Sequence, residues 1–225
     1  MLPRAKISAN RINDVLELQP EMEILEKQEN NSEKGVIEFR NVSFKYKNSD
    51  GEYTDVLKDV SFTANPGKVT AIIGGTGSGK STILNLIPRF YDVADGAVFL
   101  DGYDVRQMDF ASIYSKIGYI PQQAFLFSGT IADNLRYGKE DATDAELWRA
   151  LEIAQAKDFV EKLPDGLYSM ISQNGTNLSG GQKQRLCIAR AIVKEALFYM
   201  FDDSFSALDF ATDARLRRAL KENLK

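Results

Sequence analysis

The chain contains no histidine and a single cysteine, Cys187, among its 225 residues. Without histidine, any general base must be a carboxylate or must belong to another chain. One cysteine excludes an internal disulfide and fits a reducing compartment. No apolar run approaches the length needed to cross a bilayer. The net charge of −4 gives no basic field of the kind that duplex nucleic acid attracts, so we expect no nucleic-acid partner.

The remaining composition, 44% hydrophobic and 27% charged residues, is that of an ordinary globular protein. A chain of this length buries one sizeable core and leaves room for a satellite lobe. Apolar residues recur at helical spacing within residues 4–18, which predicts an amphipathic helix that ends before Pro20; a disordered leader is the alternative. Residues 20–35, rich in Glu and Asn, predict an exposed linker.

From Val36 onward, apolar and polar residues alternate, which predicts a strand. The alternation slips near residues 40–41, as it would at a β-bulge. A second run at residues 56–64 predicts an antiparallel hairpin with the first. Tyr46 lies at the end of the first run, where its ring can stack on a nucleotide base, although an aromatic at a strand end usually only packs.

The central motif is the segment GGTGSGKS at residues 74–81. It follows the apolar residues 69–73, which predict a buried strand, and it precedes a helical segment at residues 82–87. This context is the one that the G-x-x-x-x-G-K-[ST] phosphate-binding loop requires. A glycine-rich turn with a chance Lys and Ser is the alternative, on the order of one per cent for a chain this long.

In a phosphate-binding loop, glycines let successive backbone N–H groups close around a phosphate. Lys80 would reach the β- and γ-phosphate oxygens, and Ser81 would hold Mg²⁺. The pattern therefore predicts a nucleoside triphosphate with magnesium. The predicted nucleotide contacts in this motif are Gly74, Gly75, Thr76, Gly77, Ser78, Gly79, Lys80, Ser81 and Thr82.

Shorter strands are expected at residues 97–100 and 117–120, followed by helices in which Thr130 and Thr143 each begin a capping box. The segment NLSGGQ, residues 177–182, has the same Ser-x-x-Gln spacing, and a capping box alone would explain it. Its two glycines lie in the first helical turn, where glycine is unfavourable, which suggests that something approaches the backbone closely.

The apolar run at residues 197–201 ends in Asp202. A carboxylate at the C-terminal end of a buried strand, beside a phosphate loop, can take part in magnesium coordination, directly or through water. A simple turn at the end of the strand is the alternative. Together with Lys80 and Ser81, Asp202 is predicted to be a metal ligand.

Four motifs occur in order: GGTGSGKS, LSGGQ, FDD and SALD, at residues 74–81, 178–182, 201–203 and 206–209. They resemble the Walker A, signature, Walker B and D-loop motifs of an ABC transporter nucleotide-binding domain. The resemblance implies an α/β fold of the P-loop NTPase (RecA-like) type. Such a fold has a parallel core, an antiparallel β subdomain and an α-helical signature subdomain, here near residues 125–190. It also implies ATP and Mg²⁺ as cofactors.

Residues 119–138, YIPQQAFLFSGTIADNLRYG, resemble the Q-loop region of exporters within this family. Residues 1–34 resemble the stretch that leads from a transmembrane domain, absent here, to the ATP-binding domain at residues 35–225. The resemblance therefore implies an exporter at the cytoplasmic face of the cell membrane. It implies catalytic roles for Lys80, Gln122 and Asp203, magnesium ligands at Ser81, Gln122 and Asp202, and an adenine-stacking role for Tyr46.

The family mechanism implied is a head-to-tail pair of domains, with each ATP held between the Walker A of one and the signature of the other. The partners implied are a second nucleotide-binding domain, from a different subunit, and the transmembrane domain of the same exporter. The residues implied at the partner's nucleotide are Ser179, Gly180, Gly181 and Gln182, and Asp209 lies in the D-loop.

Two positions depart from the family pattern. Asp203 stands where the family usually has a glutamate that positions water, and Gln173 stands where many exporters have Glu. Asp is shorter than Glu by roughly 1.5 Å, whereas a base must come within about 2.6 to 3.2 Å of its proton. We therefore predict a hydrolytically weak site, typical of one half of a heterodimeric exporter.

The chain ends inside an amphipathic helical pattern with no cap or further strand, so a truncated C-terminus is expected. Two other functions stay open. One is a soluble ABC ATPase that acts without transport, and the other is a regulatory half that binds ATP and does not hydrolyse it.

Overall fold

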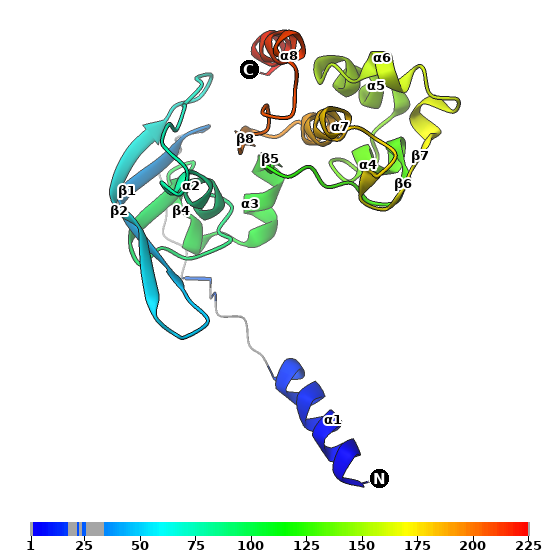
Figure 1. Cartoon of the computed structure of the whole chain (residues 1–225). Coiled ribbons are helices and arrows are strands. Elements are labelled where there is room, and N and C mark those ends of the chain that lie inside the picture. The colour runs from blue at the N-terminus through cyan, green and yellow to red at the C-terminus, as the bar shows by residue number, and fades with distance from the viewer. Residues whose placement is uncertain (1, 18–21, 23, 26–33, 225) are drawn as a thin grey trace.

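The computed structural model describes residues 2–17, 22, 24–25 and 34–224 (Figure 1). The first helix, α1 (Leu2–Leu16), confirms the expected N-terminal helix. Its large apolar side chains from Ile7 onward are exposed, from 56% at Ile7 to 74% at Leu16, and Figure 1 shows the helix well away from the other elements. Most of the predicted linker lies outside the described residues. None of the helices in the described part of the chain is long and apolar enough to span a bilayer.

An antiparallel sheet with the strand order β2-β1-β3-β4 forms one lobe. Its register shifts between Phe39 and Val42, where Asn41 has a φ of 50°, which confirms the predicted bulge. The second strand begins at Tyr53, three residues before the predicted residue 56. The strands are β1 (Ile37–Lys47), β2 (Tyr53–Ala64), β3 (Asp95–Leu100) and β4 (Tyr103–Asp104).

Two strands, β5 (Ile117–Ile120) and β8 (Phe198–Phe201), pair in parallel register. Ile117 lies opposite Phe198, and Ile120 lies opposite Phe201. Because parallel strands end at the same edge, the residues that follow them, Gln122 and Asp202, emerge near each other. The pairing therefore confirms a parallel element and places two of the predicted site residues along one edge.

The predicted strand at residues 69–73 is wrong. Among the described residues these five pair with no other strand, and Val69 and Ile73 are 94% and 93% exposed. An apolar run forms a strand only where a neighbour takes its backbone N–H and C=O groups. In the described part of the chain, β5 and β8 pair with each other alone, so this segment has no such neighbour.

The second lobe is mainly helical, with α7 (Gly180–Val193) packed against α4 (Ile131–Arg136) and α5 (Asp144–Ile153). The capping boxes predicted at Thr130 and Thr143 are confirmed. The remaining elements are α3 (Phe110–Lys116), α6 (Lys157–Val160), α8 (Phe210–Asn223), β6 (Gly129–Thr130), β7 (Met170–Ile171), and the 3₁₀ turns η1 (Val105–Gln107), η2 (Gly166–Tyr168) and η3 (Gln173–Gly175).

Leu151, on α5, is fully buried in the core of this helical lobe. Replacing it with alanine removes buried methyl groups and leaves a cavity, so we expect Leu151→Ala to lower the free energy of unfolding by about 2–5 kcal/mol. Urea denaturation followed by circular dichroism measures the change. Leu197→Ala is the matched control, because Leu197 is 52% exposed and should cost under about 0.5 kcal/mol. Equal losses in the two variants would contradict the assignment of this core.

Candidate active site

The glycine loop, residues 74–79, leads directly into α2 (Lys80–Leu86), which begins before the predicted residue 82. Gly77 and Gly79 have φ angles of 78° and 88°, a region that other residues rarely adopt. A Cβ on Gly79 would lie 2.7 Å from Leu57 Cδ2. Backbone conformation therefore favours glycine at this position, and any larger residue would also require the Leu57 side chain to shift.

The side chain of Lys80 folds back over the loop. Its ammonium group donates to the carbonyl oxygens of Gly74 at 2.8 Å and Gly75 at 2.7 Å. The charge is therefore held beside the loop backbone, where a phosphate oxygen can replace either carbonyl as acceptor. A charge-assisted bond to an anion is stronger than the bond that it replaces.

Ser81 links α2 to the end of β8. Its hydroxyl donates to Asp202 Oδ1 at 2.9 Å, across 121 positions of sequence. Asp202 is buried, and its backbone N–H donates to the carbonyl of Ile120 at 3.0 Å, which fixes the end of β8 against the end of β5. The fold thus brings together two residues that the sequence proposes as magnesium ligands.

The donor set at Ser81 and Asp202 fits Mg²⁺. Magnesium takes oxygen ligands and is usually held by one or two carboxylates together with phosphates and water. In the described part of the chain, no group of three or more His, Cys, Asp or Glu residues forms a cage for a metal. A metal at Ser81 and Asp202 would therefore depend on a bound phosphate for further ligands.

Gln122 and Asp203 face each other beyond the ends of β5 and β8. The amide Nε2 of Gln122 lies 3.5 Å from Asp203 Oδ2, at the long limit of a hydrogen bond. Asp203 has a φ of 45°, uncommon for a residue with a side chain. Its carbonyl accepts from both the backbone N–H of Ser206, at 3.3 Å, and the Ser206 hydroxyl, at 2.9 Å. This turn sets the direction of the Asp203 carboxylate.

The LSGGQ segment forms the start of α7, and its capping box is present. Ser179 Oγ accepts from the N–H of Gln182 at 3.2 Å, and Gln182 Oε1 accepts from the N–H of Ser179 at 2.8 Å. A Cβ on Gly181 would lie 3.1 Å from the carbonyl of Ala207, so the close approach at this glycine comes from the chain itself. At Gly180 an added Cβ would meet nothing within 4 Å, so the backbone there is open.

A family model described as ABC transporter matches residues 57–206, which include the GGTGSGKS, LSGGQ and FDD motifs and end at the first residue of SALD. The chain belongs to the ABC transporter family. It is 46% identical over 227 residues to an uncharacterized ABC transporter ATP-binding protein of Mycobacterium tuberculosis, matching 99% of this chain and 38% of that protein. This chain therefore spans well under half the length of that curated relative.

Two further relatives are named for an activity or a subfamily. The ATP-dependent lipid A-core flippase of Xanthomonas campestris is 45% identical over 188 residues, 83% of this chain and 31% of that protein. The structure of a bacterial Atm1-family ABC exporter with ATP bound superimposes with a TM-score of 0.88 at 32% identity, over 98% of this chain and 38% of that one. The fold is thus the α/β fold of an ABC ATPase, as predicted.

Within this ABC domain, Tyr46 lies beside the phosphate loop. Its hydroxyl is 3.4 Å from the hydroxyl of Thr82 on α2, and its ring packs edge-to-face with Phe44 and Tyr91 at centroid distances of 4.7 and 5.2 Å. The ring is therefore part of an aromatic cluster next to a predicted phosphate contact. Stacking of Tyr46 on adenine stays a prediction.

The D-loop residue Asp209 caps α8. Its carboxylate accepts from the N–H of Thr212 at 2.9 Å, and hydrogen bonds from Thr212 lower the pKa of the Asp209 carboxyl below its usual value. The lowered pKa keeps the carboxylate charged, and able to cap the helix, at more acidic pH than for an ordinary aspartate. In this chain, therefore, Asp209 fixes the start of the helix that follows the D-loop.

Sequence reasoning missed a second contact between α2 and the parallel strands. The hydroxyl of Tyr119 on β5 donates to Asn85 Oδ1 on α2 at 3.1 Å. Burial, helped by the charge of Asp202, raises the pKa of Tyr119 to about 12, so its hydroxyl keeps its proton further into the alkaline range than that of an ordinary tyrosine. One sequence feature could have indicated that Asn85 faces the strands, because it follows Ser81 by one helical turn and so shares its face; no such feature indicates Tyr119 as its partner.

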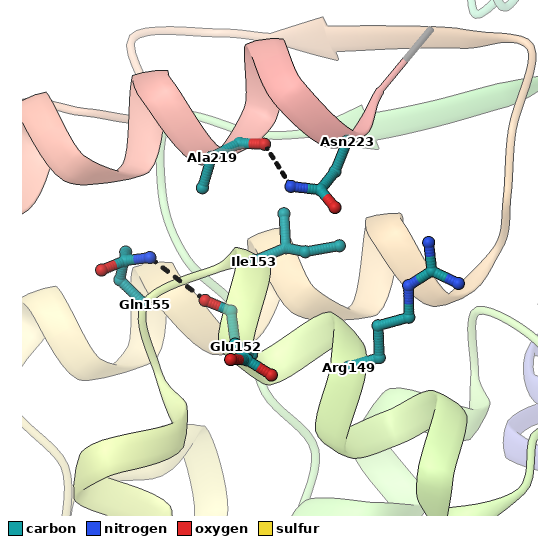
Figure 2. A pocket seen from close by; sticks show the side chains of 6 residues that line it. All are labelled: Arg149, Glu152, Ile153, Gln155, Ala219 and Asn223. Atoms are coloured by element: carbon teal, nitrogen blue, oxygen red, sulfur yellow. Dashed lines mark hydrogen bonds between the residues drawn. The ribbon is translucent and has the colours of Figure 1, made fainter.

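A cavity of about 300 Å³ lies between α5 and α8, away from the glycine loop (Figure 2). Two amides on its wall bond to backbone carbonyls of their own helical turns: Gln155 to Glu152 at 3.1 Å, and Asn223 to Ala219 at 2.9 Å. None of the predicted site residues lines this cavity.

Proposed function

We propose that the chain is the ATP-binding and ATP-hydrolysing domain of an ABC exporter, which uses Mg-ATP to drive transport across the cell membrane. The observation that carries the proposal is the contact between Ser81 and Asp202, because it joins the phosphate loop to a buried carboxylate at a strand end. The family match and the likeness to an exporter with bound ATP support it. The substrate would be selected outside residues 35–225, by a transmembrane domain reached through residues 1–34.

In the proposed mechanism, the open loop backbone and Lys80 bind the β- and γ-phosphates, while Ser81, Asp202 and Gln122 would hold Mg²⁺. The metal, when bound, would neutralise charge that develops on the phosphates during transfer to water. Gln122 and Asp203 orient the attacking water from the far side of the site. Asp203 accepts the proton of that water less effectively than a glutamate would, because its side chain is about 1.5 Å shorter.

The signature residues are proposed to act on the ATP of a second nucleotide-binding domain. Ser179 and Gly180 are exposed at the N-terminus of α7, a helix of 14 residues, where N–H groups and the helix dipole favour an anion. In Figure 1, β5 lies between α7 and α2, so the signature and phosphate loop are at separate places on one chain. Such separation suits a head-to-tail pair in which each domain completes the site of the other.

Two features together favour a heterodimer: Asp203, which predicts weak hydrolysis at this chain's own site, and an intact LSGGQ motif. In that assembly, the chain holds a hydrolytically weak site of its own and lends Ser179 to the competent site of a different subunit. Asp203 also supports a narrower function, that of a regulatory half that binds ATP without hydrolysing it. The two functions differ in whether ATP turnover depends on the residues of this chain's own site: a weak site still hydrolyses ATP, whereas a regulatory half does not.

The test is Mg-ATP turnover by the full-length subunit, alone and mixed with a second half-transporter from the same organism. We expect turnover only in the mixture, and we expect Ser179→Ala to lower it by about 100-fold, as the loss of one donor to developing phosphate charge does. Thr130→Ala is the matched control, because it removes an equivalent cap in the same lobe. Brisk turnover by the chain alone would instead indicate a homodimer with Asp203 as a competent base.

A further inference from the structure

Two polar contacts, one helical turn apart, attach α2 to the parallel strands. Ser81 donates to Asp202 after β8, and Tyr119 on β5 donates to Asn85. The two strands are themselves paired, with Tyr119 opposite Met200. One face of α2 is therefore held against both strands of the same sheet.

The Tyr119 hydroxyl makes a contact that the ring alone could not make. The ring packs edge-to-face with Phe90 at a centroid distance of 5.9 Å, a contact that phenylalanine would make equally well. Burying a hydroxyl without a partner is unfavourable, and Asn85 Oδ1 provides that partner at 3.1 Å. The bond to Asn85 is thus the distinctive contribution of tyrosine at this position.

This bond spans the two segments that carry the proposed metal ligands. Gln122 follows Tyr119 by three residues, and Ser81 precedes Asn85 by one turn. The Ser81 hydroxyl donates to Asp202, which follows β8 and is not part of β5. In the described part of the chain, the hydrogen bond that joins α2 directly to β5 is the one from Tyr119 to Asn85.

We propose that Tyr119 is a positioning residue of the nucleotide site, whose hydrogen bond to Asn85 holds α2 against β5 so that Ser81 and Gln122 reach one Mg²⁺ together. The proposal rests on the proposed function, since it assumes that Mg-ATP binds at this loop. Tyr119 itself touches neither the nucleotide nor the metal. Its effect should therefore appear in the contribution of magnesium to ATP affinity.

The experiment compares the affinity of the full chain for a fluorescent ATP analogue with Mg²⁺ and with EDTA. We expect Tyr119→Phe to reduce the Mg²⁺-dependent gain in affinity about five- to tenfold, the size of effect that one lost hydrogen bond produces, and to leave affinity in EDTA unchanged. Asn85→Ala should do the same, and the double variant should lose no more than either single variant. Thermal melting checks that each variant is folded.

Tyr199→Phe is the matched control, because Tyr199 is a partly buried tyrosine on the neighbouring strand β8 that interacts with the backbone of Ala196. Tyr199→Phe should change the affinity for the analogue neither with Mg²⁺ nor with EDTA. An unchanged magnesium gain in Tyr119→Phe, or an equal loss with and without Mg²⁺, would overturn the positioning role. Wild-type chain that binds the analogue under neither condition would instead overturn the proposed function.

Discussion

Replacing Asp203 with glutamate is expected to raise ATP turnover at this chain's own site by about 100-fold, the lower end of what a well-placed general base contributes. The carboxylate now lies at the edge of the site, 3.5 Å from the amide of Gln122, and the backbone turn held by Ser206 fixes its direction. One added methylene extends the reach by roughly 1.5 Å along that direction. The measurement is phosphate release by the assembled transporter, with the partner's phosphate-loop lysine replaced so that only this site turns over.

Asp203→Asn is the companion variant, because it keeps the size of the side chain and removes the base. We expect it to turn over no faster than the wild-type protein. If turnover stays at background in Asp203→Glu while ATP still binds, hydrolysis is not the task of this site, and the regulatory function is the better description. If Asp203→Asn is as active as Asp203→Glu, the carboxylate is not the base.

Replacing Lys80 with alanine is expected to weaken ATP binding by about 100- to 1000-fold. The ammonium group is already held over the loop by the carbonyls of Gly74 and Gly75, so little conformational freedom is lost when phosphate oxygens replace them. A hydrogen bond to a charged group contributes about 1.5–3 kcal/mol, and Lys80 can make two such bonds to the β- and γ-phosphates. Equilibrium binding of ATP, measured with Mg²⁺ present, gives the loss directly.

Lys68→Ala is the control for Lys80→Ala. Lys68 is an exposed lysine that precedes the loop, and its removal changes the net charge equally. We expect its effect on ATP affinity to be under about twofold, because exposed charges are screened at physiological salt. Equal losses in the two variants would show that general electrostatic attraction, and not the position of Lys80, accounts for the binding.

The local parts of this fold follow the sequence closely. The bulge near Asn41 and the capping boxes at Thr130 and Thr143 all form where the residue pattern places them. The strand at residues 117–120 has the predicted limits. Each of these features depends on side chains and backbone groups a few positions apart, so a short stretch of sequence contains nearly all the information needed.

The candidate site likewise has a local part, which the sequence predicts, and contacts between distant segments, which it does not. The glycines, Lys80 and Ser81 form one continuous motif, and the requirement for glycine at Gly79 follows partly from its positive φ. Asp202 was predicted because it follows an apolar run and because FDD resembles a Walker B motif, but its distance from Ser81 could not be derived from either segment alone. The pairing of Tyr119 with Asn85 was not predicted, because nothing local to either residue indicates the other.

The sequence by itself determined the chemistry available: a phosphate loop, a carboxylate after a strand, a signature helix and an aspartate in place of the usual glutamate. The tertiary structure alone decided which of these groups meet. It brought Ser81 to Asp202 and Tyr119 to Asn85, and among the described residues it left residues 69–73 without a strand partner. The physical reason is that a local motif is stabilised by bonds within a few residues, whereas a strand or a site between strands exists only where distant backbone lies alongside.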